Sequence, residues 1–114
     1  MSRIADLNFY AISSQIANAT QDKLLDAVSS KKITPSERAL IIEYISELCA
    51  TKEITNQRAH AIASALILFR ENMPDYYKCS TPEIFVAIDQ YRTTTNHSDS
   101  YQRMNLVILK RFTL

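Results

Sequence analysis

The absence of glycine constrains this chain more than any other feature of its sequence. None of the 114 residues is glycine, whereas average usage would give about eight. Glycine-rich phosphate loops, dinucleotide-binding fingerprints and the nucleophile elbow of hydrolases are therefore excluded. Tight two-residue hairpins lose the residue that most easily takes up positive φ. We therefore expect an all-α fold, a small bundle of four to five main helices with Asn, Asp and Ser in the turns.

Cap motifs indicate where the helices begin. The run Thr34-Pro35-Ser36-Glu37 is a capping box with proline at the first helical position, and it predicts a helix over residues 35–52. Thr55 is expected to cap a helix over residues 56–72. Its apolar stripe would be Ala59, Ile62, Ala63, Leu66 and Phe69.

Two more helices are expected in the last third of the chain. Thr81-Pro82-Glu83 repeats the combination of cap and proline and predicts a helix over residues 82–92. Ser98 or Asp99 would cap the last helix. We place its buried stripe at Tyr101, Met104, Ile108 and Phe112, widened by Val107 and Leu109.

The first third of the chain has a weaker pattern. Ile4, Leu7, Ala11 and Ile16 allow one amphipathic helix, and Leu24, Leu25 and Val28 allow a second, shorter one. A polar stretch over residues 29–32 is a plausible boundary. We therefore expect an N-terminal helical extension over residues 1–33 and the main domain over residues 34–114. The apolar, uncapped end at Leu114 suggests a fragment of a longer protein.

Composition indicates a soluble, intracellular class of protein. Hydrophobic residues make up 46% and charged residues 22% of the chain, as in ordinary globular domains. We find no secretory signal and no apolar run near the roughly 20 residues of a membrane span. We therefore expect a cytoplasmic protein without a membrane partner, in which Cys49 and Cys79 are reduced thiols that pack as small apolar groups.

The sequence contains no pattern typical of a self-contained enzyme. Cys49, His60, Cys79 and His97 are too widely and irregularly spaced for a zinc finger or ribbon, so we expect no metal and no cofactor. His60 is expected at a surface or rim, and His97 in a polar loop. Glu43 and Glu47 lie one helical turn apart on a face that should be solvated, which does not suit acid–base catalysis.

Positive charge collects at the C-terminal end. The formal net charge is +1, but residues 1–57 carry six basic and seven acidic side chains. Residues 90–114 carry Arg92, Arg103, Lys110 and Arg111 against Asp99 alone. Arg103 and Lys110 are two helical turns apart and share a face, with Arg111 one step further round. This end could bind a polyanion, or it could be the solvated face of an amphipathic helix.

Residues 34–114 resemble a known family. The order of capped helices beginning at Ile-Thr-Pro-Ser-Glu-Arg (33–38), with the closing helix Tyr-Gln-Arg-Met-Asn-Leu-Val-Ile-Leu-Lys-Arg-Phe (101–112), looks like the core-binding domain of tyrosine recombinases, the phage-type integrases, and especially the archaeal ones. Arg103, Leu109, Lys110, Arg111 and Phe112 match the family's closing helix. Tyr101 departs from it, since a threonine is usual there.

This resemblance implies a SAM-like helical bundle that forms one half of a clamp around double-stranded DNA at the recombination core site. Catalysis would lie in a C-terminal domain outside these residues, so the fragment itself would not be an enzyme. Its further partners would be that domain and other recombinase subunits. The candidate DNA-binding residues are Arg103, Lys110 and Arg111, followed by Arg58 and Arg92. Lys31 and Lys32 would join them if the N-terminal extension folds back.

A second class of function fits the same residues. A basic amphipathic helix with an apolar stripe can also bind a partner helix. The sequence therefore leaves a helical protein–protein interaction module, without DNA binding, as the alternative.

Overall fold

The computed structural model describes residues 16–52, 54–94 and 96–113. They form five α-helices and one short 3-10 helix, and no strand occurs among them. The elements are α2 (Asn18–Ser29), α3 (Pro35–Lys52), α4 (Asn56–Phe69), η1 (Arg70–Asn72), α5 (Thr81–Thr94) and α6 (Asp99–Thr113). The prediction of a small all-α bundle is confirmed.

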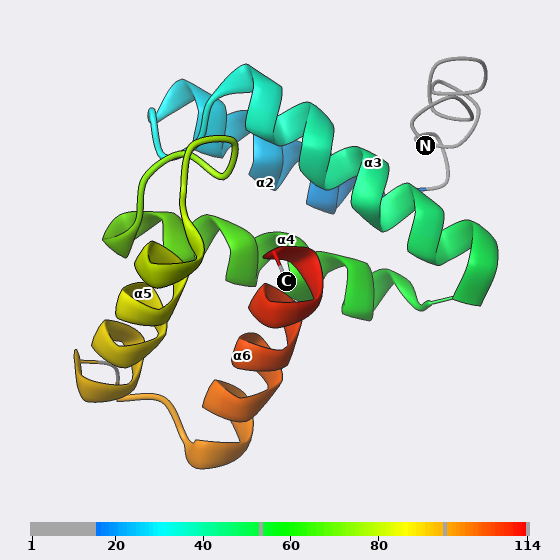
Figure 1. Ribbon diagram of the computed structural model, residues 1–114. Coiled ribbons are helices and arrows are strands. Elements are labelled where there is room, and N and C mark those ends of the chain that lie inside the picture. Colours follow the sequence, from blue (N-terminus) through cyan, green and yellow to red (C-terminus); the bar gives the residue numbers. More distant parts are fainter. Residues whose placement is uncertain (1–15, 53, 95, 114) are drawn as a thin grey trace.

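Helix α4 is the centre of the bundle. It runs between α2 and α3 on one side and the α5–α6 pair on the other (Figure 1), and it contacts α2, α3 and α6. Every residue of its predicted stripe is buried, as are Ala65 and Ile67. Three of these buried positions are alanines, whose small side chains let neighbouring helices approach closely. The sequence of α4 is therefore suited to burial on several sides.

The predicted helix caps are present, except that the cap of α5 lies one residue earlier than predicted. Thr34 and Glu37 form the reciprocal capping box: the Thr34 N–H donates to Glu37 Oε1 at 2.8 Å, and the Glu37 N–H donates to Thr34 Oγ1 at 3.1 Å. In α5 the cap is Ser80, not Thr81, because a capping box needs its glutamate three residues after the cap. The Ser80 N–H donates to Glu83 Oε1 at 2.8 Å.

The buried stripe predicted for α6 is partly wrong. The buried residues are Asn105, Leu106, Ile108 and Leu109, whereas Tyr101 is 43% and Val107 37% exposed. Asn105, a polar residue outside the predicted apolar stripe, lies on the buried side of the helix. Its side-chain amide donates to the Tyr91 hydroxyl at 2.9 Å in the interface between α5 and α6. The buried face of α6 therefore includes Asn105 and excludes Val107, which differs from the prediction.

A lysine occupies the position where glycine most often ends a helix. Lys31 has φ of 62°, the one positive value among the described residues. The N–H of Lys31 donates to the Val28 carbonyl at 3.0 Å and that of Lys32 to the Ala27 carbonyl at 2.8 Å. These bonds are the Schellman motif at the end of α2. The expectation that Asn, Asp and Ser serve the turns is therefore wrong here.

Residues 16–33 pack into the same core as the rest of the bundle. Ile16, Leu24 and Ile33 are at most 3% exposed, and α2 contacts both α3 and α4. The short helix predicted around Leu24 is therefore present. The helix predicted from Ile4 to Ile16 lies outside the described residues except at Ile16, which is in a bend before α2. Leu114 also lies outside them, and the division of the chain at residue 33 stays a prediction.

Glu37 links three segments at one end of the bundle. Its carboxylate is fully buried and accepts a hydrogen bond from Arg70 Nε of η1 at 2.6 Å. The Tyr76 N–H donates to the same oxygen at 3.0 Å. Arg70 also donates to the Met73 carbonyl at 2.8 Å. A single carboxylate therefore connects the start of α3 to η1 and the loop before α5.

Candidate nucleic-acid interface

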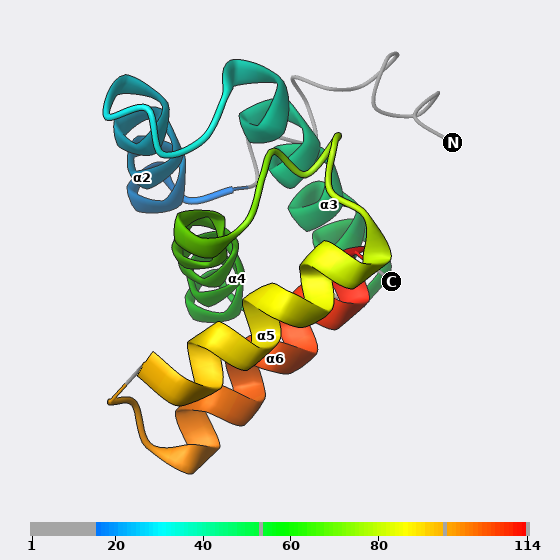
Figure 2. The same ribbon diagram turned by 60° about the vertical axis from the view of Figure 1, so that its left-hand side comes forward.

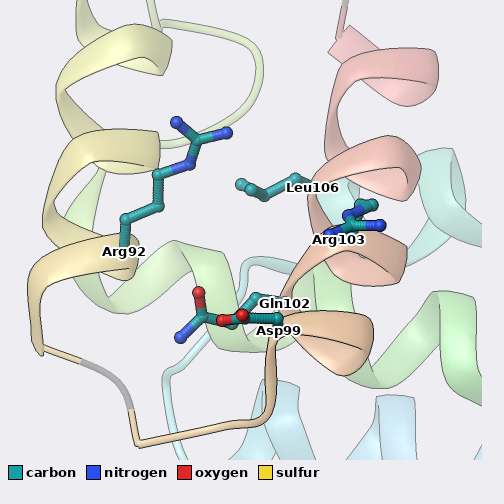
Figure 3. A pocket seen from close by; sticks show the side chains of 5 residues that line it. All are labelled: Arg92, Asp99, Gln102, Arg103 and Leu106. Carbon is teal, nitrogen blue, oxygen red and sulfur yellow. The ribbon is translucent and has the colours of Figure 1, made fainter.

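A first surface hollow lies between α5 and α6. It has a volume of about 290 Å³ and is lined by Arg92, Asp99, Gln102, Arg103 and Leu106. Figure 3 shows Arg92 and Leu106 directed into the space between the two helices, with Asp99 and Gln102 beside the connecting loop. The helices run side by side in opposite directions (Figure 2). This arrangement brings Arg92, near the end of α5, to the same end of the pair as Arg103.

A second hollow lies where α6 passes α4. It has a volume of about 390 Å³ and is lined by Arg58, Ser100, Arg103, Met104, Val107 and Arg111. Arg103 lines both this hollow and the first one, so the two adjoin. On α6, Arg103 and Arg111 flank Val107 at steps of four residues and lie on one face, opposite the buried Asn105 and Leu109.

A third hollow continues from the second one toward α3. It has a volume of about 440 Å³ and shares Arg58 and Arg111 with the second hollow. Lys52, the last residue of α3, adds a further cation. We call the surface formed by Arg92, Arg103, Arg58, Arg111 and Lys52 the cationic stripe. It crosses four helices, which belong to two consecutive pairs, α3 with α4 and α5 with α6.

Positive charge dominates the cationic stripe. Asp99 is the one acidic residue among those lining its three hollows. Within the described part of the chain, Arg70 and Glu37 form an ion pair, and none of the five cations of the stripe is paired with a carboxylate. Arg111 and Arg58 also favour the ionised form of Tyr44, although burial outweighs them and raises the Tyr44 pKa. These guanidinium groups are therefore available to an external anion.

Aromatic contacts hold the end of α6 in place. The Phe112 ring packs edge-on against Tyr44 of α3 at 5.0 Å and against Tyr76 of the loop before α5 at 5.1 Å. Burial raises the pKa of Tyr76, and its hydroxyl donates to the Leu66 carbonyl at 2.6 Å. Because Phe112 is fixed on both sides, the adjacent Arg111 projects from an ordered backbone.

A second cluster orders the loop between α5 and α6. The buried Tyr91 hydroxyl lies 3.0 Å from His97 Nδ1. It accepts from Asn105, so its own hydrogen is free for the His97 nitrogen. The His97 ring also packs against Tyr101 at 4.6 Å. Tyr101, where the sequence departs from the recombinase pattern, thus contacts the loop, and His97 positions that loop between Arg92 and Arg103.

The predicted site residues fall into two groups. Arg58, Arg92, Arg103 and Arg111 come together in the cationic stripe, whereas Lys110 is exposed on α6 but lines none of the three hollows. Lys32 lines a separate hollow with residues of α2. Sequence reasoning missed Lys52, although its place at the end of an expected helix, beside a short connection, was a usable signal.

The two cysteines and His60 lie at the edge of the core. Cys49 and Cys79 are free and pack partly buried against the core, as predicted. His60 is half-buried, with Nδ1 3.3 Å from the Thr20 hydroxyl.

Over residues 16–52, 54–94 and 96–113, no three His, Cys, Asp or Glu side chains gather as a metal site would require. In that same part of the chain no helix has the length and apolar character needed to cross a bilayer.

Comparisons with known proteins return no relative. No protein-family model, no curated protein and no solved structure matches this chain. The cationic stripe therefore has to be interpreted from its own residues and geometry.

Proposed function

We propose that this chain is the DNA-binding domain of a site-specific tyrosine recombinase and clamps duplex DNA at the recombination core site. The observation that carries the proposal is the convergence of Arg58, Arg92, Arg103 and Arg111 from three helices on one surface. An arginine guanidinium binds phosphate through two parallel hydrogen bonds, and phosphate contacts fix a protein's orientation on a duplex.

The shape of the stripe supports a linear polyanion over a compact one. Its hollows follow one another along the exposed face of α6, each sharing at least one arginine with the next. Such a row suits successive phosphates of a nucleic-acid backbone. A single small anion would use only one hollow, and it would leave the charge of the others unexplained.

The recombinase part of the proposal rests on the resemblance of residues 34–114 to the core-binding domain. The family's catalytic His-x-x-Arg motif occurs nowhere in the 114 residues. We therefore assign catalysis to a separate C-terminal domain and expect that domain and other recombinase subunits as protein partners. The protein would act in the cytoplasm, on cellular or viral DNA. Sequencing the parent reading frame tests this part: a downstream arginine, His-x-x-Arg and late tyrosine support it, and a stop codon directly after Leu114 overturns it.

The salt dependence of duplex binding tests the interface. If four arginines each neutralise a phosphate, log K falls with log salt at a slope of about −3.6, and affinity drops about a hundredfold between 50 and 200 mM salt. Arg103→Ala and Arg111→Ala should each flatten the slope by about one. Lys110→Ala, measured alongside, decides whether that exposed lysine also contacts DNA.

Lys23→Ala is the matched control. Lys23 is an exposed cation on α2 that lines none of the stripe's hollows. Its substitution should leave the slope unchanged. Equal slopes for the wild-type protein, Arg103→Ala and Arg111→Ala would overturn the proposed interface. A uniform change in all variants, the control included, would point to net charge instead of a site.

A protein-interaction module is the second candidate, because two large apolar side chains of α5 are exposed. Phe85 and Val86 of α5 are 55% and 54% exposed and lie next to each other. Large exposed apolar side chains in a cluster are typical of interaction surfaces. Light scattering with and without duplex DNA separates the two functions: self-association that DNA leaves unaffected favours the interaction module, and a DNA-dependent mass increase favours the DNA-binding domain.

A further inference from the structure

The third hollow of the cationic stripe differs from the other two in its floor. Three isoleucines and a leucine from α3, α4, α6 and the connection after α3 form that floor: Leu48, Ile54, Ile62 and Ile108. Ile62 and Ile108 are 2% exposed, and Leu48 and Ile54 are half-buried. Its volume of about 440 Å³ is the largest of the three. A phosphate can reach the cations at the edge of this hollow, but it gains nothing from the apolar floor and would lose hydration there.

Cations surround this apolar floor. Lys52 lies at the end of α3, Arg58 in the first turn of α4 and Arg111 near the end of α6, so the three come from different elements. Among the residues that the structure describes, no carboxylate lines the hollow. The stems of lysine and arginine can cover apolar surface while their charged ends stay in water. The hollow therefore combines an apolar base with a positive rim.

We propose that this hollow is a docking site for an acidic peptide segment that inserts one large apolar side chain between flanking carboxylates. The apolar side chain would pack on the half-buried Leu48 and Ile54, above the buried Ile62 and Ile108. The carboxylates would pair with Lys52, Arg58 and Arg111. Charge complementarity selects this occupant, because a neutral apolar segment would leave the three cations without partners.

The site has a consequence for the proposed DNA interface. Arg58 and Arg111 line both the third hollow and the second one. An acidic segment held by these arginines therefore competes with duplex DNA for them. This competition rests on the proposed function, whereas peptide binding itself does not.

A fluorescently labelled peptide, Asp-Asp-Phe-Leu-Glu-Asp, is a suitable probe for fluorescence anisotropy with the full chain. Two matched peptides separate the contributions. One replaces Phe and Leu by Ser and keeps the charge, and the other replaces the acidic residues by their amides and keeps the apolar pair. We expect saturable binding of the probe, and at least tenfold weaker binding of both matched peptides. Equal binding of the charge-only peptide would overturn the role of the apolar floor.

Lys52→Glu is the decisive variant. Lys52 is exposed and lines the third hollow but neither of the other two, so its reversal leaves Arg58, Arg103 and Arg111 in place. We expect it to weaken probe binding about tenfold or more, while Lys23→Glu on α2 leaves probe binding within twofold. An equal loss in both variants would overturn the site, because it would show attraction by net charge alone.

Titrating the bound probe with duplex DNA separates this inference from the proposed function. Displacement by DNA that is weakened in Arg58→Ala and Arg111→Ala supports the shared arginines. Probe binding with no measurable DNA binding would refute the DNA interface and leave the peptide site standing. DNA binding without saturable probe binding would refute the peptide site and leave the DNA interface standing.

Discussion

The buried carboxylate of Glu37 gives the sharpest test of how this bundle is held together. It accepts hydrogen bonds from Arg70 Nε at 2.6 Å, the Thr34 N–H at 2.8 Å and the Tyr76 N–H at 3.0 Å. Glu37→Ala removes all three bonds and leaves the Arg70 guanidinium without its anion. Breaking a buried ion pair from one side costs about 3–5 kcal/mol. Because the Arg70 side chain keeps 16% exposure, we expect the lower end, about 3 kcal/mol.

A loss of that size is a large share of the stability of a domain this small. Folded domains are stable by about 5–15 kcal/mol in total, so the variant should remain folded at low temperature but unfold at clearly lower urea. Urea titrations followed by circular dichroism measure the change in unfolding free energy. Glu47→Ala is the matched control, since Glu47 is an exposed carboxylate on the same helix, and it should change stability by less than about 0.5 kcal/mol.

A double-mutant cycle tests whether the two charges act together. Arg70→Leu alone leaves a fully buried carboxylate unpaired, whereas Glu37→Leu with Arg70→Leu removes both charges. The double variant should therefore be less destabilised than the sum of the single variants, by more than about 1 kcal/mol. Single-variant losses below about 1 kcal/mol that simply add would refute the assignment of Glu37 as a structural link.

Three further predictions follow from other positions. Lys31→Gly should raise the unfolding free energy by about 0.5–1 kcal/mol. Glycine removes the strain of positive φ, and this gain exceeds the loss that comes from its greater freedom in the unfolded chain. An unchanged urea midpoint would contradict this. Burial raises the pKa of Tyr76 above its ordinary 10.0, so the contribution of Tyr76 to stability is present below pH 10 and is lost as pH rises from there through the folded-state pKa. In Tyr76→Phe the loss of stability above pH 10 should therefore be smaller than in the wild type. Urea titrations below and above pH 10 measure this difference. The Ser46 hydroxyl is buried and has no hydrogen-bond partner among the described residues. Ser46→Ala should therefore leave the unfolding free energy unchanged or raise it by up to about 1 kcal/mol in the same urea assay. A loss of more than about 1 kcal/mol would indicate that the hydroxyl has a partner.

The helices could be predicted because their signals are local. Pro35 and Thr55 mark the starts of α3 and α4 through effects that act within one turn. The predicted bounds of α3 match the structure, and the range predicted for the next helix, residues 56–72, covers α4 together with η1. The error in α6 has a different origin. Asn105 is polar in the sequence but buried by a hydrogen bond to Tyr91, fourteen residues earlier. A periodicity argument has no access to such a partner.

The candidate site residues also divide into those brought together by local structure and those brought together by packing between distant helices. Arg92 and Arg103 flank one short connection between antiparallel helices, so their proximity follows from the hairpin itself and could be inferred from the sequence. Arg58 meets Arg111 only because α6 packs across α4, and that packing depends on which side of α6 is buried. The stripe predicted from apolar residues alone would have buried Val107, the residue between Arg103 and Arg111. The structure buries Asn105 and Leu109 and leaves Val107 exposed between the two arginines, so the outward face of α6 carries an apolar side chain between two cations.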